Sequence, residues 1–222
     1  MTYAVQSDGF ATVPGILGSA EQQRLIDALG AVSGAGRRGL LAKPAVSDLA
    51  RSPRMLDLVR PHVTSEPFPV RTIFFDKSPG ANWLVPWHQD LTLAVHSRAE
   101  VPGFGPWSVK DGVPHVQPPV ECLEQMLTVR LHLDDAAEAN GALRVLPGTH
   151  RLGRLSPAQV QAQRARQTDV LCTVAAGDAL LMRPLLLHAS GRSTDATAHR
   201  RVLHIEYAAF SLPAELRWHE GI

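Results

Sequence analysis

The spacing of hydrophobic residues changes about one third of the way along the chain. Before residue 70, apolar positions recur at the spacing of helices. One helix is predicted from Ser19, which forms a capping-box pattern with Gln22, to just before Gly34, and a second from Ser52 to just before Pro61. The apolar positions of these two helices are Leu25, Ile26, Leu29, Val32, Met55, Leu56 and Val59.

From about residue 70 the period becomes two, which is typical of strands, and Gly, Pro and Asn turn signals separate the segments. A third helix is predicted from Ser156 to Arg166. This order predicts a mainly β fold, a sandwich or jelly roll with helices as buttresses. We expect one domain over 1–222, with the helical buttress and first strand in about 1–70 and the jelly-roll core in about 71–212. The predicted strands are Arg71–Phe75, Trp87–Val95, Thr128–Leu133, Leu143–Leu146, Val170–Val174, Ala179–His188 and Arg201–Phe210.

Composition narrows the class of protein. The chain has 222 residues, 45% of them hydrophobic, which is ample for a core. Its 22 basic and 21 acidic residues give no charge excess for binding nucleic acid or an anionic membrane. Two cysteines make no disulfide framework, and the first residues do not have the pattern of a signal peptide. We therefore expect a cytoplasmic protein that acts on a small molecule without a nucleic-acid or membrane partner; nothing in the sequence indicates an oligomeric state.

Ten histidines, about twice average usage, raise the question of a metal site. On a strand, His88 and Asp90 share a face, so that an imidazole and a carboxylate can converge on one ion. His132 and Asp134 fit the same pattern, and spacing alone does not separate the two pairs. The sequence after Asp134 is typical of a turn, which favours His88 and Asp90. His204 with Glu206 is a further variant of this pattern.

A third metal ligand and a basic residue that could pair with a carboxylate are expected near the C-terminal end. His188 follows an apolar run and precedes small residues, so it could reach a cavity, although a buried structural histidine is the alternative. Two histidines and one carboxylate leave metal positions open, which suits non-haem Fe(II). In the strand that follows, period two puts Arg200 on the same face as His204 and Glu206, where its side chain could pair with a carboxylate. The alternative is a solvated charge.

Six segments, in this order and spacing, resemble the phytanoyl-CoA dioxygenase family of Fe(II)/2-oxoglutarate-dependent oxygenases. They are Asp8–Phe10, Pro86–Asp90, Asn140–His150, Gly177–Leu181, His188–Ser190 and Arg200–Arg201. The resemblance implies a double-stranded β-helix, related to the cupins, with helices packed on one sheet. It implies an oxygenase, most simply a hydroxylase, that consumes O2 and 2-oxoglutarate and releases succinate and CO2.

The resemblance also implies roles for particular residues. Fe(II) would be held by His88, Asp90 and His188, and the Asp90 carboxylate favours hydroxylation or desaturation over halogenation. Arg200 would bind the far carboxylate of 2-oxoglutarate; the connection from His188 is one residue longer than usual, which leaves Arg201 as an alternative. Further candidates for the co-substrate site are Lys77, Ser190 and Thr128, whereas Thr149 and His150 are expected to be structural.

The stretch from His96 to Gln125 is too long and irregular to be a hairpin alone, and we expect a lid over the active site with Trp107 facing substrate or co-substrate. A surface excursion packed by its own aromatic residues is the alternative. Arg130, His132 and Arg144 could point into the barrel beside Thr128, which would favour a polar or anionic substrate. The candidate substrate contacts are Trp107, Arg130 and Gln89.

Two other functions fit parts of the pattern. A cupin-like metal enzyme that does not use 2-oxoglutarate would leave Arg200 unexplained. A catalytically silent jelly-roll binding protein would leave the set of His88, Asp90, His188 and Arg200 unexplained.

Overall fold

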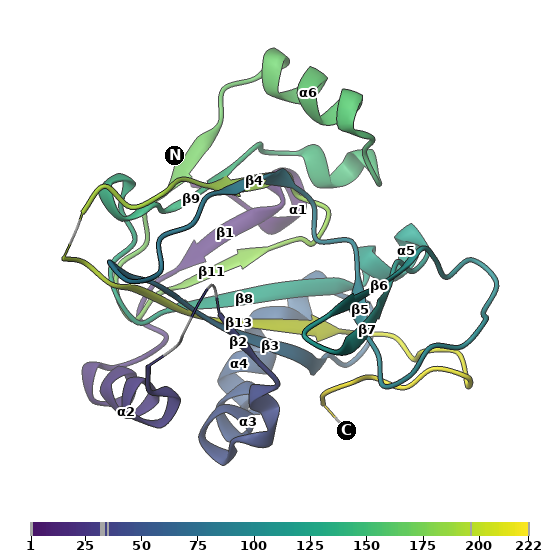
Figure 1. Cartoon of the computed structure of the whole chain (residues 1–222), viewed down its shortest axis with the longest axis horizontal. Coiled ribbons are helices and arrows are strands. Elements are labelled where there is room, and N and C mark those ends of the chain that lie inside the picture. The colour runs from purple at the N-terminus through teal and green to yellow at the C-terminus, as the bar shows by residue number, and fades with distance from the viewer. Residues whose placement is uncertain (1, 32–33, 35, 196, 222) are drawn as a thin grey trace.

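Two antiparallel sheets stacked face to face form the centre of the protein in its computed structural model (Figure 1). The structure describes residues 2–31, 34, 36–195 and 197–221. The larger sheet has six strands in the order β1 (Phe10–Val13), β11 (Ala179–Met182), β8 (Met126–His132), β13 (Arg200–Ala208), β3 (Phe68–Lys77) and β2 (Arg37–Arg38). The smaller sheet has four strands in the order β10 (Val170–Cys172), β9 (Leu143–Val145), β12 (His188–Ser190) and β4 (Val85–His88). This arrangement confirms the predicted jelly roll, whereas the single domain over 1–222 stays a prediction.

Three helices cover the outer face of the larger sheet, as predicted for a helical buttress: α2 (Ser19–Leu29), α3 (Pro44–Ala50) and α4 (Pro53–Val59) (Figure 1). The predicted helix from Ser19 ends at Gly30, and Val32 lies outside the described residues. Its expected capping box does not form, because Gly18 is the N-cap and the Gln22 amide donates to the Leu17 carbonyl instead (3.0 Å). The helices pack on apolar side chains that the sheet turns outward, chiefly Leu127, Val129, Leu131, Leu203, Ile205 and Tyr207.

The remaining helices are not part of this buttress. They are α1 (Val5–Asp8), α5 (Val120–Glu124) and α6 (Pro157–Arg166), with 3-10 turns at Leu40–Ala42, Arg60–His62, Glu138–Asn140 and Thr149–Leu152. Helix α6 is the third predicted helix, and its Ser156 and Gln159 form a reciprocal capping box. Among the described residues, no helix combines the length and apolar character needed to cross a bilayer.

The alternation predicted for β13 is present and divides the strand between core and cavity. Leu203, Ile205 and Tyr207 are buried against the helices. On the opposite face, Arg200, His204 and Glu206 are buried between the two sheets and line a cavity. One strand therefore supplies both the hydrophobic core and polar groups for a site.

Two predicted strands are each divided in the structure. The segment predicted as one strand over Trp87–Val95 leaves the smaller sheet after His88 and forms β5 (Leu93–Ala94) further on. The segment Ala179–His188 becomes β11 in one sheet and β12 in the other. The chain crosses between the sheets at Arg183 and Pro184. Pro184 cannot donate to a ladder, and the Arg183 guanidinium donates to the His62 carbonyl (2.6 Å).

The segment 96–125 is more regular than expected. It holds the hairpin of β6 (Trp107–Lys110) and β7 (Val113–Val116), which with β5 makes a third sheet in the order β5-β7-β6, and then helix α5. The stretch is therefore more than a hairpin, as expected, although its two strands and its helix were not predicted. The strands are short and Pro114 interrupts the alternating pattern, so their sequence signal is weak. The hairpin stands beside the open end of the stacked sheets (Figure 1).

Candidate metal centre and active-site cavity

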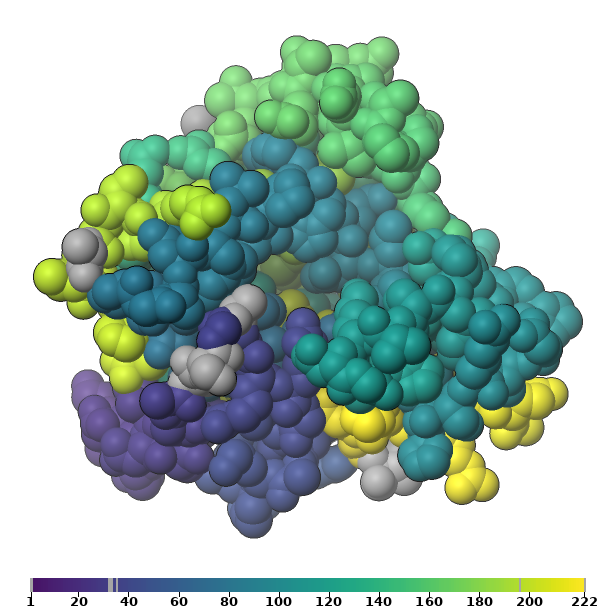
Figure 2. Space-filling view, viewed as in Figure 1, coloured from purple at the N-terminus to yellow at the C-terminus, as the bar shows by residue number. Residues whose placement is uncertain are grey.

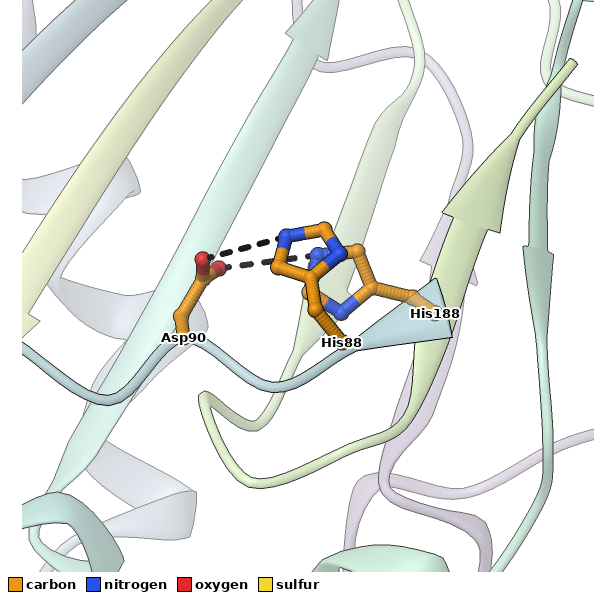
Figure 3. A group of neighbouring side chains, drawn as sticks. All are labelled: His88, Asp90 and His188. Carbon is orange, nitrogen blue, oxygen red and sulfur yellow. Dashed lines mark ion pairs between the residues drawn. The ribbon is translucent and has the colours of Figure 1, made fainter. Parts of the chain in front are cut away.

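Strand pairing brings two of the predicted metal ligands side by side. In the antiparallel pair β4 and β12, His88 lies directly opposite His188, and the centroids of their rings are 4.2 Å apart. Asp90 follows the end of β4, and its two carboxylate oxygens lie 3.7 Å from the Nε2 atoms of His88 and His188 (Figure 3). One ligand atom from each of the three residues lies within 4.8 Å of the other two, so the group could hold one metal ion.

Hydrogen bonds orient both imidazoles for this role. His88 Nδ1 lies 2.8 Å from the Pro86 carbonyl, and His188 Nδ1 lies 2.9 Å from the Leu186 carbonyl. Because a carbonyl only accepts, each Nδ1 carries the proton and each Nε2 lone pair faces Asp90. Burial lowers the pKa of His188 to about 4, so this imidazole is neutral at pH 7. Burial acts to raise the pKa of Asp90, but His188 and His88 outweigh it and hold this pKa below its usual range. Neutral imidazoles and an ionised carboxylate are the forms that bind a divalent cation.

A buried cationic group lies at one end of the same cavity. Arg200 is 3% exposed, and its Nε and Nη1 atoms are buried without a hydrogen-bond partner among the described residues. Its Nη2 makes a long contact to Ser190 Oγ (3.4 Å). Burial and the neighbouring Arg130 lower the pKa of Arg200 to about 9, which leaves it charged at pH 7. A buried guanidinium without an acceptor is suited to bind a carboxylate in two-point fashion.

Lys77 lies directly opposite Arg200 in the pairing of β3 with β13. Its Nζ donates to Ser190 Oγ (2.8 Å) and to the Gly191 carbonyl, and lies 5.3 Å from the centroid of the Trp83 ring. Burial, followed by the charge of Arg200, lowers the pKa of Lys77 to about 7. Of the predicted co-substrate residues, the structure therefore brings Arg200, Ser190 and Lys77 together.

Position 141 must be glycine for the end of the cavity beside Arg200 and Lys77 to form. Gly141 has φ 73°, and the Cβ of any other residue would meet the Gly191 carbonyl oxygen at 2.5 Å and Lys77 Nζ at 3.0 Å. The Asn140-Gly141 turn signal therefore marks a close approach of two backbones beside Lys77.

The structure distinguishes His88 and Asp90 from the other histidine and carboxylate pairs of the sequence, and Arg200 from Arg201. Asp134 accepts from the Arg201 backbone N–H (2.8 Å) and from the Arg201 guanidinium (2.7 and 2.6 Å), so both residues are occupied on the far side of the sheet from Arg200. His132 is buried on the inner face, away from that carboxylate. His204 and Glu206 contact each other (3.3 Å) and form part of the cavity wall.

A cavity of about 310 Å³ joins the metal-ligand group to Arg200, and Figure 2 shows a hollow between the segments that line it. Arg130, one of the candidate substrate contacts, lines it from β8 and donates to His204 Nδ1 (2.9 Å). Thr128 is buried on the same face of β8 but does not line the cavity. The prediction for Arg144 is wrong: its guanidinium points outward and pairs with Asp169 (2.7 Å).

Gln89 and Trp107, the other candidate substrate contacts, have different surroundings. Gln89 lines the cavity, but its amide donates to the carbonyls of Gly153 (2.8 Å) and Leu185 (2.7 Å) and accepts from the Leu155 N–H (2.9 Å), so that both polar atoms hold the backbone around β4. Trp107 packs against the hydrophobic cluster behind the hairpin and does not line the cavity. Lys110, at the end of the same strand, does line it.

Three basic residues of the lining are not among the site residues predicted from the sequence: Arg38, Arg71 and Lys110. Arg71 could have been found, because period two puts it on the same face of β3 as Lys77. Arg38 lies in a two-residue strand, and Lys110 lies in a hairpin that was not predicted, so neither carried a signal.

The jelly roll, the group of two histidines and one aspartate, and the buried arginine in the same cavity define the class of non-haem metal oxygenases that use 2-oxoglutarate. A sequence profile of the phytanoyl-CoA dioxygenase family matches residues 16–202. The chain belongs to this family, which confirms the resemblance stated from the sequence.

Relatives extend this picture. The chain is 26% identical over 185 residues to a probable alpha-ketoglutarate-dependent hypophosphite dioxygenase of Stutzerimonas stutzeri; the match covers 74% of this chain but only about half (53%) of that relative. The structure of AviO1 from Streptomyces viridochromogenes Tue57 is similar over 95% of this chain and 94% of its own, with a TM-score of 0.66 and 24% identity. EctD from S. alaskensis, solved with 2-oxoglutarate and 5-hydroxyectoine, has a TM-score of 0.71 at 19% identity, over 93% of this chain and 74% of its own. These two structures support the fold.

Proposed function

We propose that this chain is an Fe(II)- and 2-oxoglutarate-dependent oxygenase that hydroxylates a small molecule, with release of succinate and CO2. The observation that carries the proposal is the presence, in one cavity, of the three ligand side chains and of a buried Arg200 whose Nε and Nη1 lack an acceptor. When bound, Fe(II) together with 2-oxoglutarate supplies the activation of O2, and the protein positions the reactants and excludes water.

His88, Asp90 and His188 are the proposed metal ligands. The backbone carbonyls of Pro86 and Leu186 hold the Nδ1 protons, so that both Nε2 atoms are available without a change of tautomer. A set of two nitrogens and one carboxylate oxygen suits Fe(II) and leaves positions for other ligands.

Arg200 is the proposed partner of the far carboxylate of 2-oxoglutarate. Ser190 and Lys77 would support this role of Arg200. The Ser190 hydroxyl contacts both Arg200 and Lys77, and the Lys77 ammonium adds positive charge behind that hydroxyl. A dicarboxylate would neutralise a cluster of buried charges for which the described lining residues supply no acid at this end of the cavity. Arg201 is not proposed for this role, because Asp134 occupies it.

The substrate is proposed to be small, because a cavity of about 310 Å³ is near the lower end of the range for ligand sites and must also admit 2-oxoglutarate. The relative from Stutzerimonas stutzeri is named for hypophosphite, and that anion is the first substrate to test. A cytoplasmic location is likewise proposed, on the sequence alone.

Succinate formation from 2-oxoglutarate, with Fe(II), ascorbate and O2, tests the proposal even without a substrate, because such oxygenases also turn over uncoupled. We expect slow succinate release by the wild-type chain and none by His88→Ala. Fe(II) binding without any use of 2-oxoglutarate would indicate a cupin-like enzyme of another kind. If neither Fe(II) nor 2-oxoglutarate bound, and His88→Ala behaved as wild type, a silent binding protein would remain.

A further inference from the structure

The cavity has a second cationic end. Along β13 and β3, Arg200 pairs with Lys77 at one end, and Glu206 pairs with Arg71 six residues further on, which is about 20 Å at the rise of a strand. Arg38 and Lys110 line the cavity on the Arg71 side. The co-substrate proposed for Arg200 would therefore leave the other end free.

Most of the charged groups in this cavity have partners of opposite sign. Arg71 pairs with Glu206 at 3.0 Å, and Arg38 pairs with Asp111 at the rim. Arg200 is accounted for by the proposed co-substrate. The two charges of Fe(II) would be balanced by Asp90 and by the near carboxylate of 2-oxoglutarate.

Two cations remain for which the described residues offer no carboxylate. Arg130 is 6% exposed, its Nη1 donates to the neutral ring of His204, and its Nε is buried without a partner. Lys110 is exposed at the cavity mouth, and its Nζ donates only to the hydroxyl of Thr92 (3.1 Å). Arg130 lies opposite His204 in the pairing of β8 with β13, between Arg200 and Glu206, and both cations line the cavity that holds the metal ligands. An unpaired buried guanidinium is costly, and it indicates that a ligand supplies the counter-charge.

The approach to this end is also basic. A neighbouring cavity of about 420 Å³ shares Arg38 and Arg71 with the first, and its lining adds Arg37, with Asp111 as the single acid of that lining. His115 in that lining is 1% exposed, and its Nε2 has no partner among the described residues. A basic entrance concentrates anions near the site and raises their rate of association.

We propose that the substrate carries an oxyanion group, a carboxylate or a phosphorus oxyanion, and that Arg130 on the wall and Lys110 at the mouth are its charge partners. This inference rests on the proposed function, because it assigns Arg200 to the co-substrate. The hairpin of β6 and β7 then has a defined role: it brings Lys110 to the metal cavity. The part of residues 96–125 that meets the substrate is the hairpin end, and Trp107 anchors it from behind.

Isothermal titration of the Ni(II)-loaded chain, saturated with 2-oxoglutarate, tests this proposal. The probes are hypophosphite, propionate and the neutral propionamide, so that the first two distinguish the kinds of oxyanion and the third removes the charge. We expect one oxyanion or both to bind and propionamide not to bind. Lys110→Gln should weaken the oxyanion by about tenfold, and Arg130→Gln by about tenfold to a hundredfold. Lys110→Arg should restore binding.

Lys43→Gln is the matched control, because it removes the same charge from outside the cavity and should bind all probes as the wild type does. Lys110 is exposed, so its variants keep the test decisive even if Arg130→Gln fails to fold. The proposal is overturned if no oxyanion binds, if propionamide binds equally well, or if Lys110→Gln binds the oxyanion unchanged. Titration of 2-oxoglutarate into the same Ni(II)-loaded protein separates the two ideas: absence of 2-oxoglutarate binding refutes the proposed function, whereas its presence with unchanged oxyanion binding refutes this inference alone.

Discussion

Replacing Arg200 by Met should have opposite effects on the free and the 2-oxoglutarate-bound protein. In the free protein the guanidinium is buried, lacks an acceptor for Nε and Nη1, and lies beside Lys77 and Arg130. Removing a buried and unpaired charge relieves a cost of desolvation and repulsion. We expect free Arg200→Met to unfold at the same temperature as the wild type or a few degrees above it.

With 2-oxoglutarate the order reverses. A ligand at a hundred times its Kd stabilises the folded state by about 2.7 kcal/mol, and in a chain of this size each kcal/mol raises Tm by about 2–4 °C. The wild type should therefore gain about 5–10 °C. Losing a two-point contact to a charged group costs about 3 kcal/mol, or about a hundredfold in Kd. At the same concentration the variant would then gain only about 0.4 kcal/mol, or about 1 °C.

Thermal unfolding with Ni(II), with and without 2-oxoglutarate, measures both effects. Arg201→Met is the control: it loses the pair with Asp134, a partly exposed contact of up to about 1 kcal/mol, but should keep the full 2-oxoglutarate shift. If free Arg200→Met unfolded well below the wild type and still showed the full shift, Arg200 would be a structural residue and the assignment of the co-substrate end would be wrong.

Three further predictions concern Lys77, His88 and Tyr207. The pKa of Lys77, lowered to about 7, means that the folded protein loses this proton at a pH where the unfolded chain still holds it, so the stability of the free protein should rise between about pH 7 and 10. Because the carboxylates of 2-oxoglutarate favour the ammonium form, calorimetry should show its affinity falling above pH 7 by up to about tenfold per pH unit, and Lys77→Met should remove this dependence. His88→Ala should weaken Co(II) binding by about tenfold or more in equilibrium dialysis while the circular dichroism spectrum stays unchanged, since His88 lies at a strand end and is partly exposed. Tyr207→Phe leaves the buried Ala50 carbonyl without its donor and should cost about 1–3 kcal/mol in urea unfolding, with the affinity for 2-oxoglutarate unchanged.

The local alternation of residues was sufficient to predict which side chains of a strand share a face. In β13 it separated Arg200, His204 and Glu206 from the residues under the helices, and the structure confirms that division. It also put His88 and Asp90 on one side, although β4 ends between them. Such predictions succeed because the direction of neighbouring side chains depends on a few backbone angles.

The sequence could not show where a strand changes sheets or which distant groups pair. The segment Ala179–His188 is apolar apart from Arg183 and His188, and the crossing at Arg183 and Pro184 depends on contacts of the Arg183 guanidinium with carbonyls more than fifty residues away. Likewise, Arg201 is excluded from the cavity by Asp134, 67 residues earlier in the chain. Register and long-range ion pairs are tertiary properties, and a periodic pattern carries no information about them.

The charge of the inner face links the fold to the proposed chemistry. The space between two packed sheets is usually apolar, because unpaired charges there oppose folding. Here the larger sheet buries Lys77, Arg130 and Arg200 in that space, and among the described residues none of the three has a carboxylate within ion-pair distance. A fold that keeps such groups is more stable when anions occupy the cavity, so the co-substrate and an anionic substrate would each stabilise the protein that binds them. The same charges that make the free cavity unfavourable therefore select what enters it.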